Sequence, residues 1–298
     1  MTARPPVVAL LPSEPGVYRF RDDRGRALYV GRAGDLRRRV SSYWGELRGR
    51  RHLRRMVPQI ARVEALVCCS EHEAAWVERM LLSRALPRWN RVVGGMEVDV
   101  HIVLDEARRS LRLAHDPAPE TGVRCYGPYL GGTATKLAVA ALHRVFSLTY
   151  TGAGLTGTGR DLARVRGAAG QDGAAVAARI HDVLVRDPAA VAAARDALVA
   201  TRDAAAAAER YEAAATIQAE LGGLDWVLSP VRFVGAPDLD LSCSEGGLRL
   251  TLRVRGGRLE RWEQAACPTA AVSAPDEWHA FLRRNVALAT SLASHPVK

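Results

Sequence analysis

Two tyrosines and a group of arginines between residues 16 and 40 could act together on a phosphate group. Tyr18 lies in the β-rich run GVYRF (16–20), and Tyr29 lies in ALYVG (27–31). The polar residues between the two runs can turn the chain, so we predict a hairpin of two short strands. A helix is expected over residues 36–44, with Asp35 as its N-cap. This arrangement would present phenols and guanidinium groups to a phosphate backbone.

Glu78 is the carboxylate of this region whose surroundings indicate a special role. In the helix expected over residues 71–86, the neighbours three and four positions away are all apolar: Ala74, Ala75, Leu81 and Leu82. A carboxylate on the core-facing side of a helix is costly to bury unless it is paired or bound to a metal. Two interpretations stay open, an internal salt bridge to an arginine and a ligand for one divalent metal, Mg²⁺ or Mn²⁺.

The start of the same helix carries a capping box. Ser70 is followed three residues later by Glu73, the spacing at which the two side chains bond the first backbone N–H groups. We therefore expect Glu73 to serve the helix start and nothing more.

The positive charge of the chain is concentrated in its first third. The net charge is +10, from 42 Lys and Arg against 32 Asp and Glu. Residues 1–95 hold 19 arginines and 9 acidic residues, so the rest of the chain is neutral. Clustered cations on one module are the electrostatic footprint of phosphate recognition. We expect residues 1–95 to bind nucleic acid.

The spacing of the two tyrosines carries a resemblance to a known family. Gly16-Val17-Tyr18, then ten residues, then Tyr29-Val30-Gly31 resembles the signature of the GIY-YIG nucleases. The sequence YVGRAGDLRRRVSSYW is similar to one branch, the UvrC component of the bacterial excinuclease. The resemblance implies an α+β fold: a small GIY-YIG domain with an antiparallel sheet flanked by helices, then a helical region and a small C-terminal α+β region.

The resemblance also implies a set of catalytic residues for phosphodiester hydrolysis. Tyr29 would be the general base that takes a proton from water, and Tyr18 would orient the water or the Tyr29 hydroxyl. Arg39 would bind the phosphate, and Glu78 would hold Mg²⁺ or Mn²⁺. Asn90 would help to close the site.

Seven arginines are expected to contact DNA: Arg32, Arg37, Arg38, Arg39, Arg51, Arg54 and Arg55. The last two belong to a basic helix expected over residues 52–60. Helical periodicity cannot choose between Arg37 and Arg39 as the arginine of the site, because both flank the apolar stripe of the first helix. The resemblance selects Arg39.

Four further segments are expected after the first domain, residues 1–95. Residues 96–150 resemble the connecting segment of UvrC, with a hairpin from runs 98–104 and 110–115 and a tight turn at YGPY. Residues 151–173 are Gly-rich and are expected to be a linker. Residues 174–228 are Ala-rich and helical, with Asp187 as an N-cap. Residues 229–298 are expected to be an α+β remnant, with strands from residue 231 onward and a helix over 276–293.

The run ERYEAAATIQAEL (209–221) resembles the UVR motif, the helical hairpin through which UvrC docks on the excinuclease component UvrB. The resemblance implies that the partner contacts are Tyr211, Ala214, Ile217 and Leu221. Tyr211 stands where a Phe is usual, and residues 213–218 lack the usual Arg-Asp pair. A helix pair that packs within its own domain remains the alternative.

Two features of UvrC are missing from this sequence. No cysteine lies between Cys125 and Cys243, so we expect no iron–sulfur cluster. The second, RNase H-like nuclease is also missing, which predicts a truncated form with one active site. The five cysteines form no CxxC pair and the apolar runs are too short to span a bilayer, so a cytoplasmic protein without a membrane segment is expected.

These features together predict a Mg²⁺-dependent DNA endonuclease that makes a single incision, of the 3′-side type, in damaged DNA during nucleotide-excision repair. The second hypothesis is a partner-independent GIY-YIG nuclease that acts on branched or damaged DNA. The third is a DNA-binding adaptor without catalysis. An adaptor would need only the arginines, so the two tyrosines, Glu78 and Asn90 argue against it.

Overall fold

The computed structural model describes residues 4–45, 51–90, 98–118, 120–152 and 155–297. The chain divides into two compact units. The first comprises Met1–Met96 and Pro230–Lys298, and the second comprises Glu97–Ser229. The C-terminal segment, which by its local pattern is expected to be a separate remnant, therefore shares one unit with the tyrosine-bearing segment. Each unit is described by itself.

The first unit is built on the predicted hairpin. Strands β1 (Gly16–Arg21) and β2 (Ala27–Ala33) pair antiparallel, and β3 (Arg62–Val67) pairs with the other side of β1. The strand order is β2-β1-β3, which leaves β2 and β3 at the edges. Helix α1 (Leu36–Ser41) begins at Asp35, whose carboxylate accepts a hydrogen bond from the Arg38 N–H, as predicted.

The two other helices predicted for residues 1–95 have different outcomes. The basic helix over residues 52–60 is a pair of 3₁₀ turns, Arg51–Arg55 and Val57–Gln59. Pro58 explains the interruption, because its ring lacks the N–H that a continuous helix would need. Helix α2 (Glu71–Arg84) begins at Ser70 as predicted, and the Ser70 hydroxyl accepts from the Glu73 N–H.

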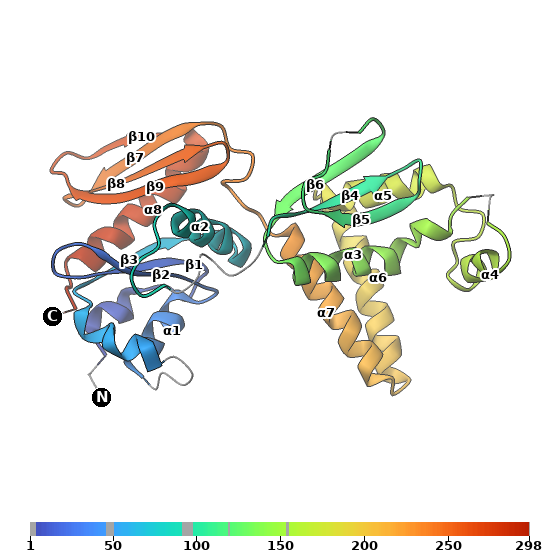
Figure 1. The fold of residues 1–298 in the computed structure, drawn as a ribbon, viewed down its shortest axis with the longest axis horizontal. Coiled ribbons are helices and arrows are strands. Elements are labelled where there is room, and N and C mark those ends of the chain that lie inside the picture. The colour runs from blue at the N-terminus through green and yellow to red at the C-terminus, as the bar shows by residue number, and fades with distance from the viewer. Residues whose placement is uncertain (1–3, 46–50, 91–97, 119, 153–154, 298) are drawn as a thin grey trace. The chain divides into compact units, whose positions relative to one another are not determined.

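The C-terminal segment forms a second sheet and a long helix. The sheet has the order β10-β7-β8-β9, and the helix α8 (Asp276–Ala293) spans the predicted residues. The strands are β7 (Leu239–Glu245), β8 (Leu248–Arg255), β9 (Arg258–Ala266) and β10 (Ala271–Ser273). Residues 231–237, expected to be a strand, form turns instead. Helices α2 and α8 lie between the two sheets, and α1 covers the opposite face of β1 and β2 (Figure 1).

Buried polar contacts join this segment to the first sheet and to helix α2. Asn285 of α8 is 1% exposed, accepts a hydrogen bond from the Val67 N–H (2.7 Å) and donates to the Val67 carbonyl (3.3 Å). Glu73, which is fully buried, accepts from the Arg232 N–H and pairs with the Arg232 guanidinium at 3.2 Å. The expectation that Glu73 serves only the helix start is therefore wrong. It neutralises an arginine that comes from 159 residues further along the chain.

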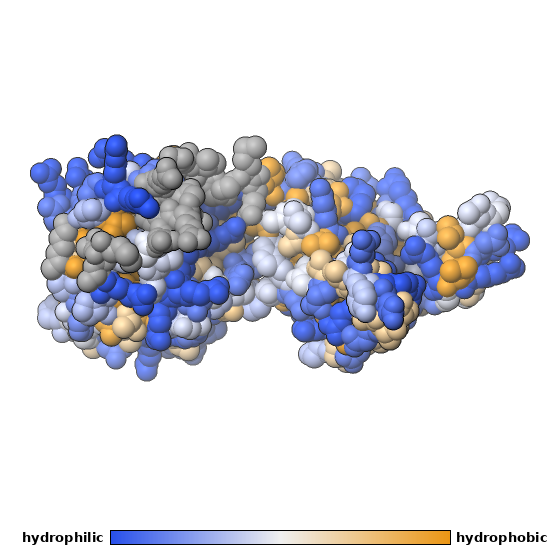
Figure 2. Space-filling model, turned by 90° about the horizontal axis from the view of Figure 1, so that it is seen from below, coloured by the Kyte–Doolittle hydropathy of each residue, from blue (hydrophilic) through white to orange (hydrophobic). Residues whose placement is uncertain are grey.

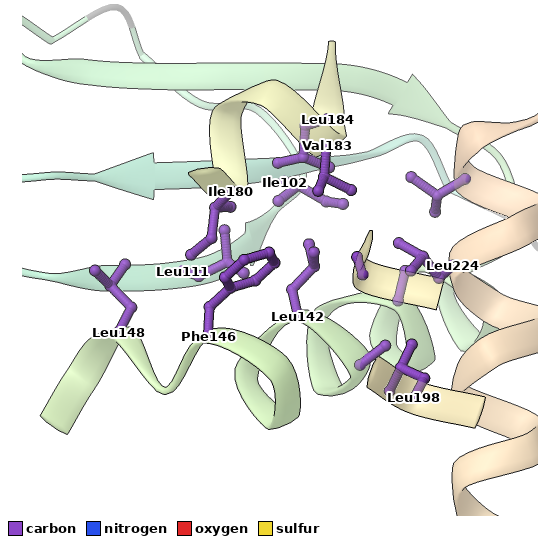
Figure 3. Close-up of a cluster of buried hydrophobic side chains, with 14 of the residues drawn as sticks. Ile102, Leu111, Leu142, Phe146, Leu148, Ile180, Val183, Leu184, Leu198 and Leu224 are labelled. Atoms are coloured by element: carbon purple, nitrogen blue, oxygen red, sulfur yellow. The ribbon is translucent and has the colours of Figure 1, made fainter. Parts of the chain in front are cut away.

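The second unit has its own sheet and core. The sheet has the order β5-β4-β6, and the predicted hairpin is its β4 and β5. Its elements are β4 (Val100–Asp105), β5 (Ser110–Ala114), β6 (Val123–Tyr129), α3 (Gly132–Phe146), α4 (Thr158–Val165), α5 (Gly173–Leu184), α6 (Pro188–Ala207) and α7 (Tyr211–Leu228). Asp187 caps α6, as predicted. Side chains from the sheet, α3, α5, α6 and α7 meet in one hydrophobic core (Figure 3).

Two local features of this unit differ from the sequence expectation. The YGPY run lies inside β6, an edge strand, rather than in a tight turn. Proline is tolerated there because the N–H groups of an edge strand have no partner strand on one side. The Gly-rich run after residue 150 contains the helix α4 in addition to irregular chain. In the described part of the chain, no helix has both the length and the apolar composition needed to cross a membrane.

Candidate active site

Three tyrosine rings gather on one face of the hairpin. Tyr18 comes from β1, Tyr29 from β2, and Tyr43 from the 3₁₀ turn that follows α1. The ring centres lie 6.2 Å apart for Tyr18 and Tyr29, 5.9 Å for Tyr18 and Tyr43, and 6.0 Å for Tyr29 and Tyr43. The hydroxyls of Tyr18 and Tyr43 share a hydrogen bond of 2.7 Å. Tyr18 and Tyr43 are buried, whereas Tyr29 is half-buried and is the accessible phenol of the three.

Sequence reasoning missed Tyr43 as a member of this group. It treats Tyr43 as part of the apolar stripe of the first helix, because the residue follows Leu36 and Val40 at helical spacing. The side chain does belong to that hydrophobic core, but its hydroxyl points to Tyr18. The one signal in the sequence was a hydroxyl on an otherwise apolar stripe.

Arg39 is the arginine of α1 that reaches the tyrosines. Its Nε donates a hydrogen bond to the Tyr18 hydroxyl at 3.3 Å, and its guanidinium lies 5.7 Å from the centre of the Tyr43 ring. Arg37 instead donates from its Nε to the Leu11 carbonyl, and Arg38 is exposed. The ambiguity between Arg37 and Arg39 is thus resolved by geometry, and a half-buried cation lies beside the phenols.

Gly31 makes this packing possible. It lies opposite Tyr18 in the antiparallel register. A Cβ at this position would approach the Tyr18 hydroxyl oxygen to 2.5 Å and the Tyr29 ring to 2.7 Å. Any other residue would displace both rings, so the absence of a side chain is a packing requirement of the tyrosine group.

The side chains of Glu78, from α2, and of Asn90 hydrogen-bond to the outer edge of β2. The Glu78 carboxylate accepts a hydrogen bond from the Arg32 N–H (3.2 Å) and lies 3.4 Å from the Arg32 Nε. The Asn90 side chain accepts from the Val30 N–H (3.0 Å) and donates to the Val30 carbonyl (2.8 Å). Residues two apart on a strand are separated by about 6–7 Å, so the two side chains are neighbours along this edge. Val30 and Arg32 flank Gly31, so Asn90 and Glu78 bond the strand on either side of the glycine against which Tyr18 and Tyr29 pack.

Both interpretations of Glu78 are compatible with this geometry. Its side chain is 15% exposed on the core-facing side of α2, and Arg32 supplies the internal ion pair that one interpretation requires. The same carboxylate can hold a metal, because a hard divalent cation needs only one or two protein carboxylates and completes its shell with water. Within the described residues no cluster of three His, Cys, Asp or Glu side chains forms, so a cation here would depend on Glu78.

Burial sets the protonation of two of the phenols. Burial, together with the neighbouring Tyr29, raises the pKa of Tyr18 far above the ordinary value near 10. Burial likewise raises the pKa of Tyr43, and Tyr18 adds to the effect. The positive charge of Arg39 opposes both shifts without cancelling them. Tyr18 and Tyr43 are therefore neutral hydrogen-bonding groups.

Most of the arginines predicted to bind DNA lie on the surface of the first unit. Arg32, Arg37, Arg38, Arg54 and Arg55 are exposed, and Arg39 is half-buried. The Arg51 side chain lies outside the described residues. In the space-filling view from the side of α1, the visible surface of this unit is mostly hydrophilic (Figure 2).

The four residues expected to bind a partner are divided between surface and core. Tyr211 is 68% exposed at the start of α7. Ala214, Ile217 and Leu221 are buried and belong to the core of the second unit. These three side chains therefore match the alternative expectation, in which the helix pair packs within its own domain. Tyr211 is the one of the four that a partner could reach.

Comparison with known proteins identifies the first segment. Residues 14–91 match the family model of the UvrC-like GIY-YIG domain. The chain is 34% identical over 142 residues to the UvrABC system protein C of Geobacter metallireducens, a match that covers 47% of this chain and 23% of that protein. It is 38% identical over 153 residues to the UvrABC system protein C of a Mycobacterium species, strain KMS, with coverage of 50% and 22%. The chain spans about a quarter of the length of these curated relatives.

Solved structures of the same domain also match. The GIY-YIG N-terminal endonuclease domain of UvrC from Thermotoga maritima, bound to magnesium, is 31% identical. The match covers 28% of this chain and 90% of that chain, with a TM-score of 0.26. A point mutant of that domain bound to the catalytic divalent cation is 29% identical over 28% of this chain and 91% of that chain, again with a TM-score of 0.26. Residues 14–91, which contain the tyrosine group and Glu78, are a UvrC-like GIY-YIG domain.

Proposed function

We propose that this protein is a Mg²⁺- or Mn²⁺-dependent DNA endonuclease that makes a single phosphodiester incision, of the 3′-side type, in damaged DNA. The observation that carries the proposal is the convergence of an accessible phenol, a guanidinium and a carboxylate around Gly31. Tyr29 and Arg39 lie on the tyrosine face, and Glu78 lies at the adjacent strand edge. A DNA-binding adaptor would have no use for this convergence.

The chain's own residues can be assigned separate tasks in the hydrolysis. Tyr29 is the accessible phenol, so it is the group that can take a proton from the attacking water. Tyr18 and Tyr43 stay protonated and hold each other through their hydroxyls, so they keep the Tyr29 ring in place and orient Arg39. Arg39 offers its remaining N–H donors to a phosphate oxygen, where they stabilise developing negative charge.

Glu78 is the residue that would hold the metal ion. A bound Mg²⁺ or Mn²⁺ supplies charge neutralisation at the phosphate and at the leaving oxygen. Asn90 acts through the backbone, because both of its amide atoms are used by Val30. It is therefore a positioning residue that keeps Tyr29 and Gly31, the neighbours of Val30, in register.

The biological setting follows from the relatives and remains part of the proposal. The relatives are components of the UvrABC system, so we infer a role in nucleotide-excision repair in the cytoplasm. The excinuclease component UvrB is the proposed partner, reached through Tyr211. The second candidate function, a partner-independent nuclease for branched or damaged DNA, is favoured by the burial of Ala214, Ile217 and Leu221, which removes three of the four expected partner contacts from the surface.

The decisive experiment measures nicking and binding of the same lesion-bearing duplex. We expect Tyr29→Phe and Glu78→Gln each to abolish nicking in Mg²⁺ while DNA affinity changes little, because the arginines are retained. Tyr150→Phe in the second unit and Glu71→Gln in the first turn of α2 are matched controls and should nick normally. If the unaltered protein binds DNA but never nicks it, with or without UvrB, the adaptor function is correct and the nuclease proposal is wrong.

The same assay separates the two nuclease functions. Stimulation of nicking by UvrB, with a cut on the 3′ side of the lesion, supports the repair role. Equal nicking without UvrB, and preference for branched over lesion-bearing duplex, supports the partner-independent nuclease.

A further inference from the structure

A hollow of about 420 Å³ lies beside α1, on the side of the helix away from the tyrosine group. We call it the arginine hollow. Its lining includes Arg4, Arg37, Arg38, Asp35, Ser41 and Ser42. Three arginines from two separate segments of the chain thus line one hollow.

The arginines of the hollow are available for an outside ligand. Arg4 and Arg38 are exposed, and neither guanidinium pairs with an acidic residue of the described chain. Arg37 donates from its Nε to the Leu11 carbonyl at 2.6 Å, which fixes the Arg37 side chain and leaves its terminal N–H groups as further donors. Among the described residues of the lining, Asp35 is the one carboxylate, and its Oδ1 already accepts the Arg38 N–H as the helix cap. Among these same residues, positive charge therefore exceeds negative charge by two.

The chemistry of the lining suits a phosphate group. Guanidinium groups bind phosphate oxygens through paired N–H donors, and Ser41 is a further polar residue of the lining. The described residues of the lining include no aromatic side chain on which a base could stack. A negatively charged phosphate group is the ligand class that the excess of arginine over carboxylate in the lining favours.

The position of the arginine hollow relative to the tyrosine group indicates that the bound phosphate belongs to the DNA backbone. Arg39 points from α1 to the tyrosine group, whereas Arg37 and Arg38 line the hollow, so α1 forms a ridge between the two sites. A helix with side chains is about 10–12 Å wide, and one strand of DNA advances about 3.4 Å per nucleotide along its axis. A strand that crosses this ridge would therefore place its next anchored phosphate about three nucleotides away.

We propose that the arginine hollow binds one backbone phosphate of DNA about three nucleotides from the phosphate that is cut. The inference rests on the proposed nuclease function, since it takes DNA as the substrate. It adds Arg4 and Ser41 to the DNA-contacting surface and gives the duplex a second anchor, which fixes its direction across the tyrosine group.

The first test measures how DNA affinity depends on salt, without metal and without cleavage. Each phosphate neutralised by a protein contributes about 0.9 to the slope of log affinity against log salt. We expect the double variant Arg4→Gln/Arg38→Gln to lower the magnitude of this slope by about 0.9. The control, Arg24→Gln/Arg258→Gln, removes the same charge from two exposed arginines of the first unit, one of them in the turn at the far end of the hairpin. It should lower the slope by less than half as much.

The second test locates the phosphate. A series of duplexes would carry one neutral methylphosphonate at each position from one to six nucleotides on either side of the cut. We expect one position, about three nucleotides away, to weaken binding by the unaltered protein but not by Arg4→Gln/Arg38→Gln. Inorganic phosphate at millimolar concentration should compete only weakly, because the hollow binds a phosphate that the duplex already holds nearby.

The outcomes separate the inference from the function on which it rests. Nicking together with an unchanged salt slope in the double variant would leave the nuclease function standing and overturn the inference. A methylphosphonate effect that is equal in the double variant and the unaltered protein would overturn it as well. Strong competition by inorganic phosphate, with no dependence on DNA position, would assign the hollow to a free anion instead.

Discussion

Replacement of Asn285 tests whether the C-terminal segment supports the nuclease sheet. Asn285→Leu keeps a side chain of similar size but removes both amide atoms. The Val67 N–H would then be buried without a partner, which costs about 1–3 kcal/mol, and the weaker bond to the Val67 carbonyl would add about 1 kcal/mol. We therefore expect the free energy of unfolding of the first unit to fall by about 2–4 kcal/mol.

Urea unfolding followed by tryptophan fluorescence measures this change. Five of the six tryptophans belong to the first unit, so the signal reports mainly on that unit. With a denaturant slope of about 2 kcal/mol/M, the midpoint should fall by about 1–2 M. Ser291→Ala, an exposed substitution on the same helix, should shift the midpoint by less than about 0.3 M, since surface changes stay within about 0.5 kcal/mol.

The result that would refute the reasoning is an Asn285→Leu midpoint equal to that of Ser291→Ala. Asn285 would then not bond the edge of β3 in solution. The segment from residue 230 onward would be a neighbour of the GIY-YIG domain and not a part of its fold.

Three further predictions concern the tyrosines. Tyr43→Phe removes the hydroxyl that bonds Tyr18, so we expect single-turnover nicking to slow by about tenfold, equivalent to about 1.4 kcal/mol, with DNA affinity unchanged; an unaltered rate would exclude Tyr43 from the site. Because burial raises the pKa of Tyr18 and Tyr43 above the value near 10 of the unfolded chain, the stability that they contribute is complete below pH 10 and is lost as the pH rises further. Urea midpoints between about pH 9 and 11 should consequently fall more steeply for the unaltered protein than for Tyr43→Phe, and parallel curves would contradict the assignment. Tyr211→Asp, at an exposed position, should abolish co-purification with UvrB without changing the urea midpoint measured by circular dichroism, which also reports on the helical second unit; persistent co-purification, or none with the unaltered protein, would remove the docking proposal.

Much of the local structure was predictable because its causes lie within a few residues of one another. The caps at Asp35, Ser70 and Asp187 accept hydrogen bonds from N–H groups three residues ahead, so each helix start is visible in a short window of sequence. The hairpin follows from two β-rich runs around a turn. The core-facing position of Glu78 follows from the helical period.

The basic helix and the YGPY turn were predicted incorrectly for the opposite reason. Pro58 interrupts the helical hydrogen bonding, and an edge position in the sheet accommodates Pro128 in a strand. Helical periodicity and turn propensity alone do not reveal which strand will lie at the edge of a sheet.

The sequence by itself determined which segment carries the phenols, guanidinium groups and carboxylate of the candidate site, since residue type, spacing and charge are properties of the chain. Only the tertiary structure decided that the Tyr43 hydroxyl joins Tyr18, that Asn90 serves the backbone of β2, and that Ala214, Ile217 and Leu221 face inward. It also decided that Asn285 completes the edge of a strand 218 residues away. The physical reason is that these contacts satisfy buried polar groups and fill a core, and their partners are chosen by packing across the whole chain rather than by any local pattern.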